Sequence, residues 1–188
     1  FIHPPSHQQP DHVDHYYFVD YNPNPLWSND FGGVHTNSGI PNKIMYLVIQ
    51  GDEHYDIIVE PFEDDIVQSR IVAGNIWFAW NSYYLDKEDD FEIGREKMLQ
   101  ACYDLYPNRL DYYQTISNAW ASTGIGNPIL SGDVNQDQVV NIQDIIIMIN
   151  IIMSNWDTTE TQLILGDVNS DGIIDILDIV AVVNIIMN

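Results

Sequence analysis

The chain of 188 residues has room for one ordinary domain and one small one, and its apolar fraction of 45% can fill a packed core. Its formal charge of −22, from 28 acidic residues against six Lys and Arg, argues against nucleic acid or an anionic membrane as partner and favours bound cations. No apolar stretch has the length of about 20 residues that spans a bilayer. Cys102 is the single cysteine, which excludes an intrachain disulfide, and its place on an apolar helical stripe predicts a buried thiol.

In the first two thirds of the chain, the sequence predicts an irregular segment followed by helices. Residues 1–33 are expected to be irregular, because they contain five prolines and the pair Gly32-Gly33. From Asn42 onward, apolar residues recur at helical spacing. We expect helices over 42–50, 64–85, 91–106 and 110–123. Their short connections predict antiparallel neighbours in a helical bundle.

The composition changes near residue 128, which predicts a boundary between a domain at 1–127 and a module at 128–188. Nine acidic residues and no Lys or Arg occur from residue 128 onward. The sequence from Gly132 to Asp137 recurs 34 residues later, from Gly166 to Asp171. Each copy leads into a strongly apolar helix, at 145–153 and 179–187. Two copies are too few for a solenoid, so we expect a small paired module.

Each repeat has oxygen-bearing residues at the spacing of an EF-hand loop, in which a hard cation is surrounded by six to eight oxygens. Two calcium ions are therefore expected. In the first loop the predicted ligands are Asp133, Asn135, Asp137, the Val139 carbonyl, Asn141 and Asp144. In the second they are Asp167, Asn169, Asp171, the Ile173 carbonyl, Asp175 and Asp178. The alternative is a pair of Asx-rich turns that cap two helices.

The two loops differ at the residue that makes the sharp turn. Gly172 supplies it in the second loop, whereas Gln138 holds that position in the first. A side chain there strains the turn, so we expect the first site to bind calcium more weakly. In both loops the last ligand is Asp rather than the longer Glu.

Two loops in register, each followed by a helix, resemble the type I dockerin module, and the resemblance covers residues 131–188. It implies a cohesin-like partner that contacts the starts of the two helices, here Ile142, Gln143, Ile176 and Leu177. Helices that are apolar all round cannot bury every face in so small a module, so an exposed apolar patch is expected. These residues are not the polar pairs of well-known dockerins, and docking within the chain or to a wall component is the alternative.

The stretch from Asp30 to Lys43 reads D-F-G-G-V-H-T-N-S-G-I-P-N-K. It resembles the D-x-G-G-V-H-x-N-S-G-I-x-N-K signature in the C-terminal domain of thermolysin-like zinc peptidases. Further matches extend the resemblance over about residues 3–126. The expected fold is therefore mainly α: the helical C-terminal domain of such a peptidase, followed by a small duplicated half-EF-hand module.

The resemblance implies that His35 stabilises the oxyanion of the tetrahedral intermediate and that Asp30, across the Gly32-Gly33 turn, holds its imidazole. It also implies a catalytic zinc, held by two His of H-E-x-x-H and a later Glu. No His of this chain is followed by Glu. We therefore expect the zinc ligands, the general base and an active-site Arg upstream of Phe1. His12 and His15 are an alternative metal pair, without an obvious third ligand.

Two functions follow. The first is a secreted metalloendopeptidase acting on proteins or peptides, extracellular or attached to a cell surface, of which this chain alone is inactive. The second is a non-catalytic, calcium-dependent binding protein on a degenerate protease scaffold.

Overall fold

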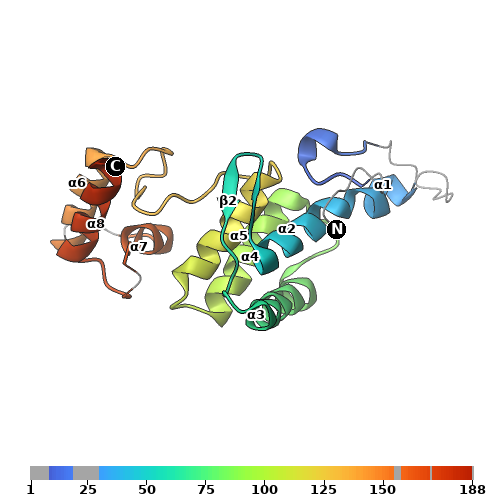
Figure 1. Cartoon of the computed structure of the whole chain (residues 1–188), viewed down its shortest axis with the longest axis horizontal. Helices are drawn as coiled ribbons and strands as arrows, with labels where there is room; N and C mark the ends of the chain where they lie inside the picture. The colour runs from blue at the N-terminus through green and yellow to red at the C-terminus, as the bar shows by residue number, and fades with distance from the viewer. Residues whose placement is uncertain (1–8, 19–29, 155–157, 170, 188) are drawn as a thin grey trace. The chain divides into compact units, whose positions relative to one another are not determined.

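The computed structural model describes residues 9–18, 30–154, 158–169 and 171–187 (Figure 1). It is mainly helical, as the sequence predicts. The chain forms two compact units, one of Phe1–Leu105 with Thr115–Pro128 and the other of Tyr106–Gln114 with Ile129–Asn188. Among the described residues, no helix combines the length and the apolar character that crossing a bilayer requires.

Five α-helices, one π-helix and a short 3-10 helix at Val13–His15 make up the helical part of the described chain up to residue 128. They are α1 (Asp30–Asn37), α2 (Gly39–Gln50), α3 (Ile66–Ala79) with the π-helix Trp80–Tyr84, α4 (Phe91–Leu105) and α5 (Leu110–Ser122). The side chains of Ile44, Leu47, Ile116 and Trp120 have no exposed surface. Cys102 is fully buried as well, which confirms the prediction of a structural thiol.

Helical structure begins earlier than the sequence suggested. Residues up to 33 were expected to be irregular, but α1 begins at Asp30, and α2 begins at Gly39 rather than Asn42. Pro41 lies in the first turn of α2, where its missing N–H has no intrahelical acceptor to lose. Gly33 has a φ of +86°, and a Cβ there would lie 3.0 Å from the Tyr17 carbonyl oxygen. Tertiary contacts therefore allow glycine and proline residues, which predict a loop, to lie within helices.

A hairpin that the sequence analysis did not predict connects α2 to α3. Its strands, β1 (Asp52–His54) and β2 (Ile57–Val59), pair antiparallel, with Glu53 opposite Ile58. The two turn residues, Tyr55 and Asp56, both have positive φ, as a two-residue hairpin turn requires. Asn and Gly are the residues typical of that turn, so the sequence carries no clear signal for it.

In the second unit, two helices follow the repeats and one short helix lies between them. They are α6 (Ile142–Ile152), α7 (Glu160–Gly166) and α8 (Ile176–Met187). The core contains Val134, Ile145, Met148, Leu165 and Val182. The first loop and the three helices each contribute one or two of these residues, and Val168 and Ile174 of the second loop pack against them, so the small module folds around both repeats together.

The segment at residues 9–16 is anchored by aromatic and histidine side chains. The His12 ring stacks on the Tyr55 ring with centroids 3.9 Å apart. The Nε2 atom of His54 lies 3.2 Å from the Asp11 carbonyl oxygen. Burial lowers the pKa of His54, although the Asp11 carbonyl opposes that shift. These contacts attach the hairpin to the segment that precedes α1.

Replacing Gly39 by Ala should destabilise the fold by about 1–3 kcal/mol, because a Cβ at this position would collide with the Pro10 carbonyl oxygen and lie 2.8 Å from Gln9 Cβ. Gly74→Ala is the matched control, since a Cβ at that helical glycine meets nothing within 4 Å. It should stabilise the protein by about 0.5–1 kcal/mol. Denaturant unfolding of both variants measures the difference, and equal effects would contradict the close approach.

The lowered pKa of His54 predicts that the free energy of unfolding falls as pH drops through about 6.5. The unfolded chain takes up the proton first, so acid favours unfolding until the folded state is protonated too. His54→Gln should flatten this dependence between about pH 7.5 and 5.5. The midpoint of thermal unfolding, measured across that range, tests the prediction. An unchanged slope in the variant would show that other groups cause it.

Candidate functional site

His35 lies on α1 with an exposed side chain. Two donors hold its backbone carbonyl: Gln9 Nε2 at 2.7 Å and Ser38 Oγ at 2.6 Å. Gln9 Nε2 also lies 3.3 Å from Ser38 Oγ, which links the two donors. The carbonyl belongs to the last turn of α1, where helical acceptors lack intrahelical partners. Gln9 and Ser38 therefore fix the end of the helix that presents His35.

Asn37 secures the opposite side of the same helix. Its side chain accepts a hydrogen bond from the Tyr17 N–H at 2.8 Å and donates one to the Tyr17 carbonyl at 3.0 Å. Asn37 is buried, at 3% exposure. Sequence reasoning did not single out Gln9, Asn37 or Ser38. Asn37 and Ser38 lie inside the motif that carried the family resemblance, and only the fold shows that Gln9 reaches it.

The predicted partner of His35 lies outside the described side chains. Asp30 is the first residue of α1, and only its backbone is described. Asp30 and His35 belong to one helix rather than to the two sides of a turn, as the glycine pair had suggested. The role of Asp30 in holding the imidazole stays a prediction.

The alternative metal pair, His12 and His15, has other contacts and gains no third ligand among the described residues. His12 Nδ1 accepts a hydrogen bond from the Asp14 N–H at 3.1 Å, and His15 Nδ1 lies 3.5 Å from the Tyr55 hydroxyl. Over the described ranges, no three His, Cys, Asp or Glu side chains cluster closely enough to hold a metal. In the described part of the chain, a zinc site is therefore not built from these groups.

The two repeats fold into loops with matching hydrogen bonds. In the first, Asp133 accepts from the N–H groups of Asp137 and Gln138, at 3.1 and 2.9 Å. In the second, Asp167 accepts from the N–H groups of Asp171 and Gly172, at 3.0 and 2.8 Å. The first predicted ligand of each loop thus organises the turn around itself.

The last predicted ligand closes each loop in the same way. Asp144 accepts from the N–H groups of Asn135 and Asn141, at 3.1 and 2.8 Å. Asp178 accepts from the N–H groups of Asn169 and Asp175, at 3.1 and 2.8 Å. These bonds bring the ends of each loop together. The two loops therefore share one hydrogen-bonding pattern, although their carboxylates do not form a metal-binding cluster among the described residues.

The first and last predicted ligands of both loops are buried carboxylates. Asp144 and Asp178 have no exposed surface, and Asp133 and Asp167 are 2% and 6% exposed. Burial raises the pKa of Asp133, and the charges of Asp144 and Asp137 add to the shift, while the amide bonds from Gln138 and Asp137 oppose it. Buried carboxylates require a compensating charge. The sequence from residue 128 onward has no Lys or Arg to supply one, so the donor set fits a hard divalent cation.

The turn residues differ between the loops as expected. Gln138 has a φ of +70° and Gly172 a φ of +89°. Only glycine adopts such a backbone without strain, so the first loop carries a cost that the second avoids. Gln136 in the first loop has a positive φ as well.

The predicted partner residues lie at the starts of α6 and α8. Ile142, Ile176 and Leu177 are 64%, 69% and 59% exposed, and Gln143 is exposed too. Further along the same helices, Ile146 and Val180 are each 53% exposed. Apolar side chains of this size are therefore displayed on the second unit, as the sequence predicts, although their role in binding stays a prediction.

Comparisons with known proteins agree with the two parts of the chain. Residues 2–125 match the thermolysin metallopeptidase alpha-helical domain, and residues 131–187 match the dockerin type I domain. Among curated relatives, the thermostable neutral protease NprT of Geobacillus stearothermophilus is 32% identical over 122 residues, which are 65% of this chain and 20% of that protein. The thermolysin of Alicyclobacillus acidocaldarius subsp. acidocaldarius shows the same identity and coverage.

Neutral protease B of Bacillus subtilis (strain 168) is 30% identical over 122 residues, covering 64% of this chain. The chain spans about a fifth of the length of these relatives. The matched region contains α1 to α5 and the residues that fix His35. The chain therefore belongs to the thermolysin family of metallopeptidases, whose alpha-helical domain it contains, and it continues into a type I dockerin domain.

Proposed function

We propose that this chain is the C-terminal part of a secreted zinc metalloendopeptidase, in which His35 stabilises the oxyanion formed during peptide hydrolysis. The supporting observation is the arrangement of His35: its side chain is exposed, while Gln9 and Ser38 fix its backbone carbonyl. A group that stabilises a transition state must be held in place before the reaction, because moving it costs free energy. The family membership supplies the reaction class.

In this proposal the parts of the reaction are divided between this chain and the rest of the protein. Zinc, bound by residues outside this chain, would supply polarisation of the scissile carbonyl and activation of water. The His35 imidazole donates a hydrogen bond to the carbonyl oxygen as negative charge develops on it. Asp30 holds the imidazole in its orientation.

Replacing His35 by Ala in the longer polypeptide that carries the zinc-binding part should lower kcat by about 10²–10³, because one preorganised donor is lost. KM and the zinc content should change little. Peptide hydrolysis and metal analysis measure these quantities. His15→Ala serves as the control, since it removes an exposed histidine elsewhere in the same unit.

A variant with unchanged kcat would contradict the role of His35. A longer polypeptide that binds no zinc and hydrolyses no peptide would instead support the alternative function, a non-catalytic calcium-dependent binding protein. The two results are distinguishable, because only the first requires an active parent protein.

We further propose that both dockerin loops bind calcium. Carboxylates at the first, fifth and twelfth positions would hold the ion, together with amide and carbonyl oxygens. The proposed residues are Asp133, Asn135, Asp137, Val139, Asn141 and Asp144 in the first loop, and Asp167, Asn169, Asp171, Ile173, Asp175 and Asp178 in the second. The buried aspartates and the matching hydrogen bonds support this assignment.

The helix starts would then contact a cohesin-like protein through Ile142, Gln143, Ile176 and Leu177. Their exposure supports an apolar contact at this place. Through it the peptidase would be attached to an extracellular or cell-surface assembly, and secretion of the chain is part of the same proposal.

Calcium titration should show two sites, with a Kd of about 10⁻⁵ M or lower at the tighter one. Asp144→Ala should remove the first site and Asp178→Ala the second. The site that survives in Asp144→Ala should be the tighter, because Gly172 makes its turn without strain. At 100 times the Kd, calcium should stabilise the second unit by about 2.7 kcal/mol.

Calorimetric titration and thermal unfolding with and without calcium test these statements. Gln138→Gly is the informative companion variant, since it should raise the affinity of the first site alone. Absence of any calcium-dependent stabilisation would overturn the metal assignment, and a tighter first site would overturn the argument from turn strain.

A further inference from the structure

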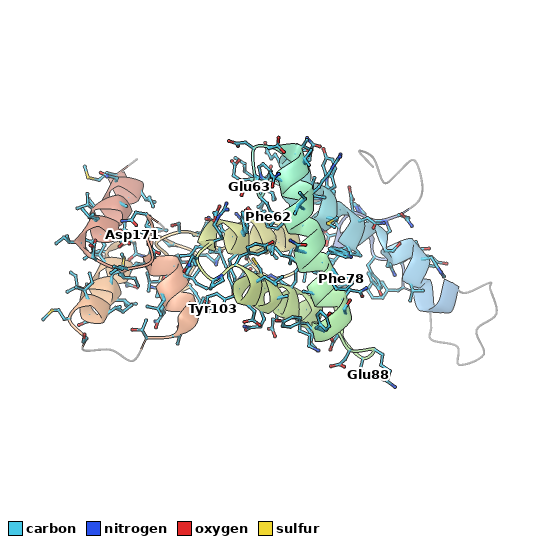
Figure 2. The ribbon with its side chains drawn as sticks, turned by 90° about the horizontal axis from the view of Figure 1, so that it is seen from below. Phe62, Glu63, Phe78, Glu88, Tyr103 and Asp171 are labelled. Carbon is cyan, nitrogen blue, oxygen red and sulfur yellow. The ribbon has the colours of Figure 1, made fainter. Side chains whose placement is uncertain are left out.

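The exposed face of α3 is apolar in a chain that is otherwise strongly acidic. Val67, Ile71 and Phe78 are 55%, 50% and 62% exposed. Together with Gly74 they are spaced by four, three and four residues, which places them on one narrow face of the helix. Tyr83 of the following π-helix, 76% exposed, packs its ring against Phe78 with centroids 6.0 Å apart and extends the face. We call Val67, Ile71, Gly74 and Phe78 the α3 stripe (Figure 2 labels Phe78).

The helix that carries this face also lacks acidic residues. Residues 66–84 contain no Asp, Glu or Lys and a single Arg, Arg70, whereas the whole chain has a formal charge of −22. Two copies of so acidic a chain repel one another when most of their surfaces meet. Along the α3 stripe no acidic residue of 66–84 adds to that repulsion, and apolar area is gained.

We propose that the α3 stripe is a self-association surface that pairs with the same stripe of a second copy of this chain, the two helices running antiparallel. A two-fold pairing uses the same patch on both copies, so the patch must complement itself. The stripe does so in one register, which sets Ile71 opposite the partner's Gly74 and Val67 opposite the partner's Phe78.

The open space at Gly74 is the feature that selects this register. A Cβ at Gly74 would meet nothing within 4 Å, so the surface has a shallow gap there. The Ile71 side chain of the second copy fits over the gap, and each large Phe78 lies over the smaller Val67. A parallel pairing would instead set Phe78 against the partner's Phe78 and leave the gap empty, which loses contacts.

The flank of the stripe fits the same arrangement. Arg70 is exposed and Trp77 is half-buried, and both lie on one side of the stripe. In the antiparallel register, each Arg70 approaches the partner's Trp77, which permits a cation–π contact at both ends of the interface. No acidic side chain from residues 66–84 opposes another.

Sedimentation velocity of the 188-residue chain in calcium tests the proposal. A single pair of helices gives a small interface, so we expect a weak dimer with a Kd of about 10⁻⁵ to 10⁻⁴ M. Added salt should tighten the dimer, because it screens the repulsion between two acidic chains. A chain that stays monomeric up to about 10⁻³ M overturns the proposal.

Ile71→Glu should weaken the dimer by about tenfold or more, because it places two charges in the apolar contact near the middle of the pair. The control is Ile58→Glu, at a side chain that is 63% exposed on β2 and off the stripe, and it should leave the dimer intact. Circular dichroism establishes that both variants are folded. A dimer that survives Ile71→Glu, or that is lost in Ile176→Glu instead, places the contact elsewhere and overturns the proposal.

Disulfide trapping tests the register. Cys102 is fully buried, so introduced cysteines are the exposed thiols. A mixture of Val67→Cys and Phe78→Cys chains should form the mixed disulfide faster than either chain forms its own. Faster formation of the Val67→Cys homodimer indicates a parallel pairing and overturns the antiparallel register.

Discussion

The site around His35 depends on a close approach of two backbones at Gly39. The carbonyl of Pro10 lies where a Cβ of this residue would be, so the segment at residues 9–12 rests directly on the start of α2. That contact brings Gln9 to the end of α1, where it and Ser38 hold the His35 carbonyl. Asn37 holds the Tyr17 backbone on the opposite side. The break between α1 and α2 is thereby fixed in position, and with it the direction in which His35 leaves the helix.

The loops of the second unit depend on their buried negative charges. Four buried aspartates organise two loops through paired backbone amides, yet no cationic side chain follows residue 128 to offset them. Amide hydrogen bonds stabilise the carboxylates only in part, and burial still raises the pKa of Asp133. Bound calcium would offset these charges, and its binding free energy would then add to folding. The exposed apolar faces of α6 and α8 follow from the small size of the module, because a core of five buried residues cannot cover both helices completely.

The sequence predicted the elements with strong local signals and missed those that tertiary contacts create. The extents of α4 and α5 agree with their apolar periodicity to within a residue, and the two loops predicted from the recurring spacing form with matching hydrogen bonds. In contrast, α1 contains Gly32 and Gly33 and follows a stretch rich in proline, so its helical state depends on Asn37 and Gly39 meeting residues far away in sequence. The Tyr55-Asp56 turn was not predictable, because it is stabilised by the stacking of Tyr55 on His12. The contact of Gln9 with the His35 carbonyl could not be predicted either, because the two residues are 26 positions apart in the sequence.

The two units also use their apolar surface differently. On the second unit, exposed isoleucines lie in an acidic sequence that contains no Lys or Arg, so a partner there has to tolerate or match negative charge. On α3 the surrounding residues are neutral apart from Arg70, so the face presents no such requirement. The two surfaces would therefore differ in the partners they accept. Charge repulsion disfavours an acidic partner at the second unit, whereas α3 has no acidic residue that would repel one. The choice of partner at α3 then depends on the absence of acidic residues as much as on the apolar side chains.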